Sequence, residues 1–219
     1  MSKTQIKQQV FYSKRMEKLN NGNASPETEK ITCVGVELVI VGHLSAPKIW
    51  TVIELTSKPQ TGRQKGQMSL PTETKKVGEN ELSNILGALA EFCSDDQLPN
   101  LKKHLFLLPD SYYKGVLSSN NNPGDLAILV YDGDTDIQFT PLNRDEVEPN
   151  GWIPVGELGG KNNIRDVAQQ FIQLNENEDL IKKAINTFRN FQDKRIPVFP
   201  PDFSLERFYR QREKLRNVV

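Results

Sequence analysis

The chain has 219 residues, with 28 basic and 28 acidic side chains and a formal net charge of zero. Its composition, 37% hydrophobic, predicts a folded protein and lacks the excess positive charge typical of nucleic-acid-binding chains. No apolar run approaches the roughly 18 residues of a membrane span, so no membrane contact is expected. Cys33 and Cys93 are too few for a disulfide framework, which predicts a reduced, cytoplasmic setting.

The length predicts one main domain with an extension at each end. We assign residues 1–30 to a flexible basic N-terminal segment, 31–175 to the main domain and 176–219 to a C-terminal helical extension. The N-terminal segment is weakly amphipathic from Ile6 to Leu19 and then has the composition of a linker. Its lysines either contact a polyanion or belong to a solvated tail.

Two strands are expected at the start of the main domain. Residues 31–41 and 48–56 are rich in Val, Ile, Thr and Trp, and the break from Gly42 to Pro47 suits a hairpin. The loop that follows, Ser57 to Glu73, contains two glycines and three cations that are available for phosphate. These cations are Lys58, Arg63 and Lys65. The alternative is an ordinary solvated loop.

The middle of the chain predicts a helix over 81–92 and then further strands. These strands are expected at residues 101–108, 113–117, 126–131 and 137–140. Pro109 to Ser111 separates the first two, and Asp132-Gly133 favours a hairpin between the last two. The series Asp132, Asp134, Asp136 resembles a calcium loop but lacks its distal glutamate, so we interpret it as a turn.

The C-terminal part predicts helices over 164–174 and 179–191 and a last helix capped by Ser204. The apolar faces of the first two are expected to cover the sheet, which gives a sandwich of a mixed sheet between helices. Residues 182–216 carry ten Lys or Arg against four Asp or Glu. This is the main charge asymmetry of the chain.

One segment carries a family motif. Gly66 to Pro71 leads through Gly78-Glu79 into the amphipathic segment Glu81 to Phe92. This arrangement resembles the Nudix box, G-x5-E-x7-R-E-U-x-E-E-x-G-U with U an aliphatic residue, and the loop before it. Laid on without a gap, the pattern matches at three positions, Glu79, Leu89 and Glu91.

A second feature supports the resemblance. Trp152-Ile153-Pro154-Val155 is similar to the segment that often precedes the final helix of Nudix domains. The resemblance implies an α+β or α/β chain with a Nudix-like α/β/α sandwich around a mixed sheet, followed by the C-terminal helices.

The resemblance also implies altered chemistry. In the family, three glutamates on one helix face hold divalent cations against a diphosphate. The corresponding positions here are Ala88, Glu91 and Phe92, which are expected to share one helix face, and the family arginine is replaced by Gly87. A degenerate box of this kind implies loss of ordinary hydrolysis and no cofactor. If the chain is active, Mg²⁺ is the expected cofactor, with Glu91 and Glu79 as catalytic residues and Glu91 as a weak metal ligand.

Three functional hypotheses follow. In the first, the chain is a pseudoenzyme that binds a phosphorylated or nucleotide-like small molecule in a regulatory role. Lys58, Arg63 and Lys65 would then meet phosphate, and Phe92 would reshape the groove. In the second, it is a metal-dependent pyrophosphohydrolase in which further carboxylates join Glu91. The candidates are Glu54, Glu73, Glu79 and Glu81. In the third, the basic C-terminal helix binds a protein or a nucleic acid.

Overall fold

The computed structural model describes residues 35–58, 62–74, 80–119, 122–133, 137–141 and 144–216. The predicted N-terminal segment, Glu79, Asp134 and Asp136 lie outside these residues. The strands are β1 (Gly35–Gly42), β2 (Lys48–Glu54), β3 (Met68–Ser69), β4 (Thr72–Thr74), β5 (Leu105–Ser119), β6 (Asn122–Tyr131), β7 (Val147–Pro154) and β8 (Ile196–Pro197). The helices are α2 (Glu81–Ala90), α3 (Leu98–His104), α4 (Asp166–Glu178), α5 (Leu180–Asn190) and α6 (Leu205–Arg216), with short 3-10 turns η2 (Val155–Gly160) and η3 (Gln192–Lys194).

The described strands form one mixed sheet with the order β3-β2-β1-β6-β5-β8, in which β4 also pairs with β1 and β7 with β2. Strand β1 runs parallel to β6 from Val36 opposite Asp125 to Val41 opposite Val130. The other strand pairs are antiparallel. Strand β1 therefore lies inside the sheet, which explains its apolar sequence with both faces buried.

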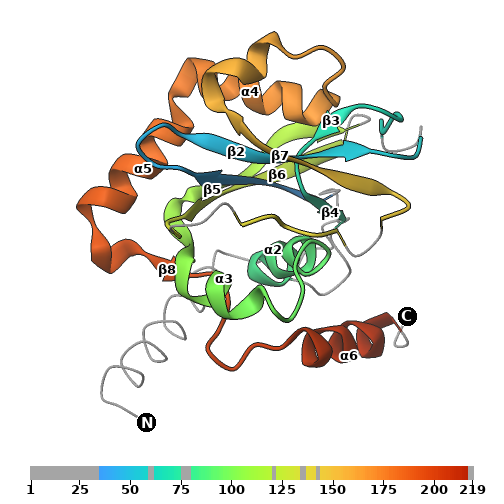
Figure 1. Ribbon diagram of the computed structural model, residues 1–219, viewed down its shortest axis with the longest axis vertical. Coiled ribbons are helices and arrows are strands. Elements are labelled where there is room, and N and C mark those ends of the chain that lie inside the picture. Colours follow the sequence, from blue (N-terminus) through green and yellow to red (C-terminus); the bar gives the residue numbers. More distant parts are fainter. Residues whose placement is uncertain are drawn as a thin grey trace, which may run out of the picture.

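Helices cover both faces of the sheet. From β1, Val36 and Leu38 pack into the cluster that includes α2, whereas Val39 and Val41 pack into the cluster that includes α4 and α5. Figure 1 shows α4 and α5 on one side of the sheet and α2, α3 and α6 on the other. The expected α/β/α sandwich with a mixed sheet is confirmed.

The sheet divides between β1 and β2. These strands pair only at one end in the described chain, at Val41 opposite Ile49 and Gly42 opposite Lys48. Beyond this end, β3 pairs with β2 and β4 pairs with β1, so residues 67–74 lie between the diverging strands. The Leu38 amide donates to the Pro71 carbonyl at 2.8 Å, which closes part of the gap. The fork creates space for polar side chains inside the sheet.

The C-terminal helices continue the core past residue 175. Leu180 and Phe188 of α5 are buried against the sheet, and β8 pairs with β5. Helix α5 and strand β8 of the predicted C-terminal extension therefore belong to the same core and sheet as the strands before them. The Ser204 hydroxyl accepts from the Arg207 amide at 3.3 Å, which confirms the predicted cap of α6. None of the described helices is long and apolar enough to span a membrane.

Three local predictions were wrong. Leu101–His104 is the end of helix α3, because Pro99 stands in its first turn, where proline favours helix initiation. Strand β5 continues through Pro109 to Ser111 as an irregularity in its pairing with β6. Residues 137–140 have no regular structure, so they do not complete a hairpin. The first error overlooked the local helix signal of Pro99, whereas the other two depend on strand pairing that local sequence patterns do not contain.

Ser111 stabilises the irregularity in β5. Its hydroxyl donates to the Leu108 carbonyl at 2.9 Å and accepts from the Leu108 amide at 3.2 Å, and both residues are buried. We expect Ser111→Ala to lower the free energy of unfolding by about 1–3 kcal/mol, because two buried backbone groups lose their partner. Urea denaturation measures this change. Ser118→Ala, at an exposed position of the same strand, is the control, and an equal effect of both variants would contradict the interpretation.

Candidate functional site

Two adjoining cavities lie beside the fork in the sheet. Their volumes are about 360 Å³ and 230 Å³. Both are lined by Arg63, Thr72, Glu91 and Glu146, so they meet at these residues. We refer to the two cavities together as the groove. The larger cavity also has an apolar wall, formed by Val52, Leu70, Phe92, Val147 and Tyr209.

Buried polar side chains form the inner end of the smaller cavity. Glu37 of β1 and Thr72 of β4 are register partners, so their side chains lie on the same face. The Thr72 hydroxyl donates to Glu37 Oε2 at 2.7 Å. Arg165, just before α4, donates from Nη1 to the same hydroxyl at 3.2 Å. This Nη1 lies 3.5 Å from Glu37 Oε1 and 3.8 Å from Glu54 Oε1.

Burial changes the acidity of the two inner carboxyl groups. It raises the pKa of Glu37 from 4.5 to about 7, and Arg165 and the Thr72 hydroxyl only partly offset this effect. Burial also raises the pKa of Glu54, against the opposing charges of Arg63 and Arg165. The two guanidinium groups are therefore the main charges that oppose this rise in pKa.

A small hairpin presents the cations of the loop after β2. Lys58 and Arg63 face each other in an isolated antiparallel bridge, with the Lys58 amide donating to the Arg63 carbonyl at 2.9 Å. Residues directly opposite each other in such a bridge direct their side chains to the same face. The hairpin therefore places an ammonium and a guanidinium group side by side.

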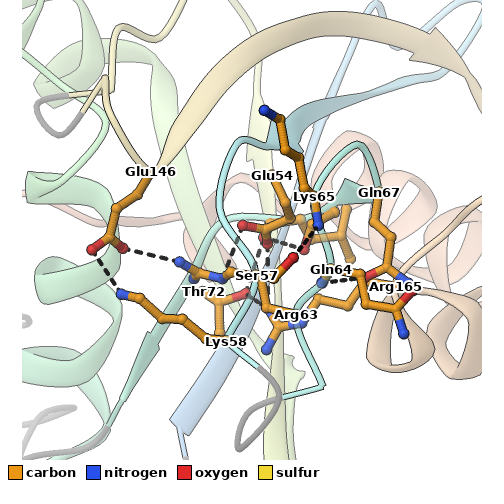
Figure 2. Close-up of polar contacts among 12 residues, drawn as sticks. Glu54, Ser57, Lys58, Arg63, Gln64, Lys65, Gln67, Thr72, Glu146 and Arg165 are labelled. Carbon is orange, nitrogen blue, oxygen red and sulfur yellow. Dashed lines mark hydrogen bonds and ion pairs between the residues drawn. The ribbon is translucent and has the colours of Figure 1, made fainter.

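Arg63 joins a buried carboxylate to a more exposed one. Its Nε lies 2.9 Å from Glu54 Oε2, and its Nη1 donates to Glu146 Oε2 at 3.0 Å. Lys58 Nζ donates to the other oxygen of Glu146 at 2.7 Å. Figure 2 shows the Arg63 guanidinium between the carboxylates of Glu146 and Glu54. The hydrogen bond from Lys58, followed by the charges of Lys58 and Arg63, lowers the pKa of Glu146.

The residues predicted to bind ligand do not all face the groove. Lys58 lines the smaller cavity, and Arg63 lines both. Phe92 lines the larger cavity and packs edge-on against Trp50, with ring centroids 5.6 Å apart. Lys65 lines neither cavity, and Figure 2 shows its side chain directed away from Arg63 and Glu54.

The expected common face of Ala88, Glu91 and Phe92 is not present. Helix α2 ends at Ala90, and the Phe92 amide donates to the Leu89 carbonyl in a tightened last turn. Ala88 and Phe92 are buried in the core, whereas Glu91 is exposed and lines both cavities. The prediction was wrong because it assumed that the helix continues to Phe92.

The described residues do not fit a magnesium site. No three acidic, histidine or cysteine side chains of the described chain are grouped so that they could hold a metal ion. Glu37 and Glu54 face guanidinium groups, and Glu91 follows the end of α2 and lines both cavities. Because Mg²⁺ prefers near-octahedral oxygen coordination, this donor set is poorly suited to it.

The other carboxylates considered for a metal site have different surroundings. Glu81 forms an ion pair with Lys114. Glu73 is buried on β4 and lines the smaller cavity. In the C-terminal helix, the described cations Arg207 and Arg210 each lie against an acidic neighbour. The expected roles of these residues in hydrolysis or in partner binding remain predictions.

Sequence reasoning missed several groove residues. Glu37 carried a signal, because a carboxylate inside the apolar strand Gly35–Gly42 must find a partner when buried. Arg165, Glu146 and Tyr209 carried none, because their contacts join segments that are distant along the chain. Tyr209, for example, donates its hydroxyl to the Ala90 carbonyl across 119 positions, at 2.7 Å.

No protein-family model and no curated protein matches the chain in sequence. Its structure is similar to the Nudix hydrolase RenU from M. smegmatis (TM-score 0.44, 11% identity), over 67% of this chain and 88% of that one. It is similar to the Nudix domain of Shewanella oneidensis NrtR complexed with ADP-ribose (TM-score 0.43, 15% identity), over 78% and 97% of the two chains. A MutT/Nudix family protein from Enterococcus faecalis is matched at a TM-score of 0.45 and 11% identity, over 100% and 88%.

The raised pKa of Glu37 predicts a pH-dependent stability. The folded protein keeps a proton on Glu37 that the unfolded chain releases between pH 4.5 and about 7. The contribution of Glu37 to the free energy of unfolding is therefore fully present below this window. It falls by roughly 3 kcal/mol as the pH rises through the window. We expect the free energy of unfolding of the wild type, minus that of Glu37→Gln, to fall across this window in urea denaturation. If the free energies of unfolding of the two proteins change with pH in parallel, the raised pKa of Glu37 is contradicted.

The core position of Phe92 predicts the outcome of restoring the family glutamate. Phe92→Glu should cost about 4 kcal/mol or more, because it removes an aromatic contact and buries a charge. Calorimetry with Mg²⁺ should find no gain in affinity. Asp96→Asn, at an exposed position four residues further along the chain, is the control and should change stability by less than about 0.5 kcal/mol. A folded Phe92→Glu protein that binds Mg²⁺ would contradict this prediction. It would support the sequence-based expectation that positions 88, 91 and 92 share one helix face.

Proposed function

We propose that the chain is a Nudix-like module that binds a phosphorylated or nucleotide-derived metabolite in the groove and has lost ordinary hydrolysis. The resemblance of Gly66 to Asp95 to a Nudix box supports the family assignment. The observation that carries the loss of hydrolysis is the pairing of Glu37 and Glu54 with Arg165 and Arg63. Two buried carboxylates of the groove already have cationic partners from the chain itself.

The charge pairing disfavours metal-dependent hydrolysis. A divalent ion at Glu54 would have to displace or face two guanidinium groups, and Glu54 is only 1% exposed. Separating a buried ion pair costs several kcal/mol, because each partner is left without compensation. Glu91 alone offers too few oxygens to offset that cost.

The shape of the groove supports a ligand with two chemically different parts. The larger cavity has the Phe92 and Tyr209 rings in its wall, which suits a flat apolar group such as a base. The smaller cavity presents Lys58 and Arg63, which suit an anionic group. A nucleotide-derived metabolite combines both parts, and its binding would give the module a sensing or regulatory role.

Calorimetry with ADP-ribose, in the absence of divalent metal, tests the ligand assignment. We expect saturable binding to the wild type and roughly tenfold weaker binding to Lys58→Ala, because a charge-assisted hydrogen bond to phosphate is removed. Lys65→Ala is the matched control from the same loop and should bind like the wild type, since Lys65 lines neither cavity. Absence of binding to all three proteins, repeated with diadenosine tetraphosphate and NAD, would reject a nucleotide ligand.

Phosphate release tests the loss of hydrolysis. With Mg²⁺ or Mn²⁺, we expect the purified protein to release little phosphate from nucleoside diphosphate-linked substrates, because the described carboxylates do not gather around an ion. A substantial rate that Glu91→Gln abolishes would establish the chain as a hydrolase. A rate that Glu91→Gln leaves unchanged would point to a contaminant.

A further inference from the structure

We propose that Glu146 is a resident carboxylate that fills an anion site formed by Lys58 and Arg63, and that an anionic group of the ligand replaces it. The inference rests on the proposed function for its ligand, but the anion site itself is defined by this chain alone. The chemical class that fits is a phosphate or diphosphate whose oxygens take the positions of the Glu146 carboxylate.

The geometry of the site matches a small oxyanion. One Glu146 oxygen accepts from Lys58 Nζ at 2.7 Å, and the other accepts from Arg63 Nη1 at 3.0 Å. The Lys58–Arg63 bridge fixes the spacing of the two donors, because each residue is hydrogen-bonded to the other through its backbone. A planar guanidinium beside an ammonium group is a common arrangement for binding phosphate oxygens.

The two carboxylates at Arg63 differ in how readily they can leave. The Glu54 side chain is 1% exposed, whereas the Glu146 side chain is 33% exposed and lies in a turn before β7. Glu54 therefore holds the Arg63 guanidinium in place from inside. Glu146 can exchange with a solute, because its carboxylate can return to water at little cost.

Because of where Glu146 lies, displacement of its carboxylate would change the shape of the groove. Glu146 and Arg63 line both cavities, so the ion pair stands where the cavities meet. Movement of the carboxylate away from Arg63 would open this junction. A ligand with an anionic group in its middle could then extend into both cavities while Lys58 and Arg63 hold that group.

The surrounding charges explain why the resident carboxylate must leave. Glu73 and Glu91 also line the smaller cavity, so it contains carboxylates besides that of Glu146. A phosphate next to an ionised Glu146 would meet direct like-charge repulsion. When Glu146 withdraws, Lys58 and Arg63 are left facing the incoming group.

Calorimetry with inorganic pyrophosphate, at low ionic strength and without divalent metal, tests the site. We expect Glu146→Gln to bind pyrophosphate roughly tenfold more tightly than the wild type, because the competing charge is gone. Glu148→Gln is the matched control, since Glu148 is exposed two positions along the chain and lines neither cavity. Adding Lys58→Ala to Glu146→Gln should reverse the gain.

A second variant tests the geometry without removing the charge. Glu146→Asp shortens the side chain, so it should reach only one of the two cations and give a smaller gain. Equal pyrophosphate affinity of the wild type, Glu146→Gln and Glu146→Asp would overturn the proposal. An equal gain in Glu148→Gln would also overturn it, because the effect would then come from net charge alone.

The outcome separates the anion site from the proposed function. A pyrophosphate gain in Glu146→Gln, with no ADP-ribose binding by any variant, would support the anion site and reject the nucleotide ligand. ADP-ribose binding that is the same in the wild type and Glu146→Gln would reject Glu146 as the resident group and leave the proposed function standing.

Discussion

The contacts of Arg63 and Arg165 with Glu54 and Glu37 are the constraint on which the groove depends. A buried ion without a partner costs several kcal/mol, so each of these side chains is tolerated because the others are present. The four residues come from β1, β2, the loop after β2 and the start of α4. Their ion pairs therefore hold four separate parts of the chain in one fixed arrangement.

The backbone provides the space for these charges. Strands β1 and β2 pair at Val41 opposite Ile49 and Gly42 opposite Lys48 and diverge away from this end, and residues 67–74 enter between them to pair with both. A continuous sheet would have placed Glu37 and Glu54 among apolar neighbours, where an ionised carboxylate is very costly. The fork lets arginine side chains reach them. The same division of the sheet lies beside the two cavities.

Sequence patterns predicted the layers of the fold but not the charge pairs. Alternating and helical apolar periodicity depends on local spacing, so strands β1, β2, β5 and β6 and the helices of the second half were predicted, whereas β3, β4, β7 and β8 were not. Leu101–His104 was expected to be a strand but is the end of helix α3, which Pro99 helps to start. Glu37 carried a local signal that was missed, a carboxylate in an apolar strand, whereas its partner Arg165 lies 128 positions away and had no local signal. Whether the Phe92 side chain is buried depends on where α2 ends, and aligning the sequence with a motif does not show where a helix ends.

The charged side chains of the site differ in their exposure to water, and this difference separates a fixed part of the site from an exchangeable part. Exposure of the side chains rises from 1% at Glu54 through 16% at Arg63 to 33% at Glu146. Because electrostatic interactions weaken as water approaches, the inner pair holds the guanidinium firmly and the outer pair is easily replaced. A site built in this way presents a preorganised cation to a ligand without leaving that cation unpaired in the free protein. In the function proposed above, Arg63 and Lys58 supply the positive charge that holds the anionic group of the ligand.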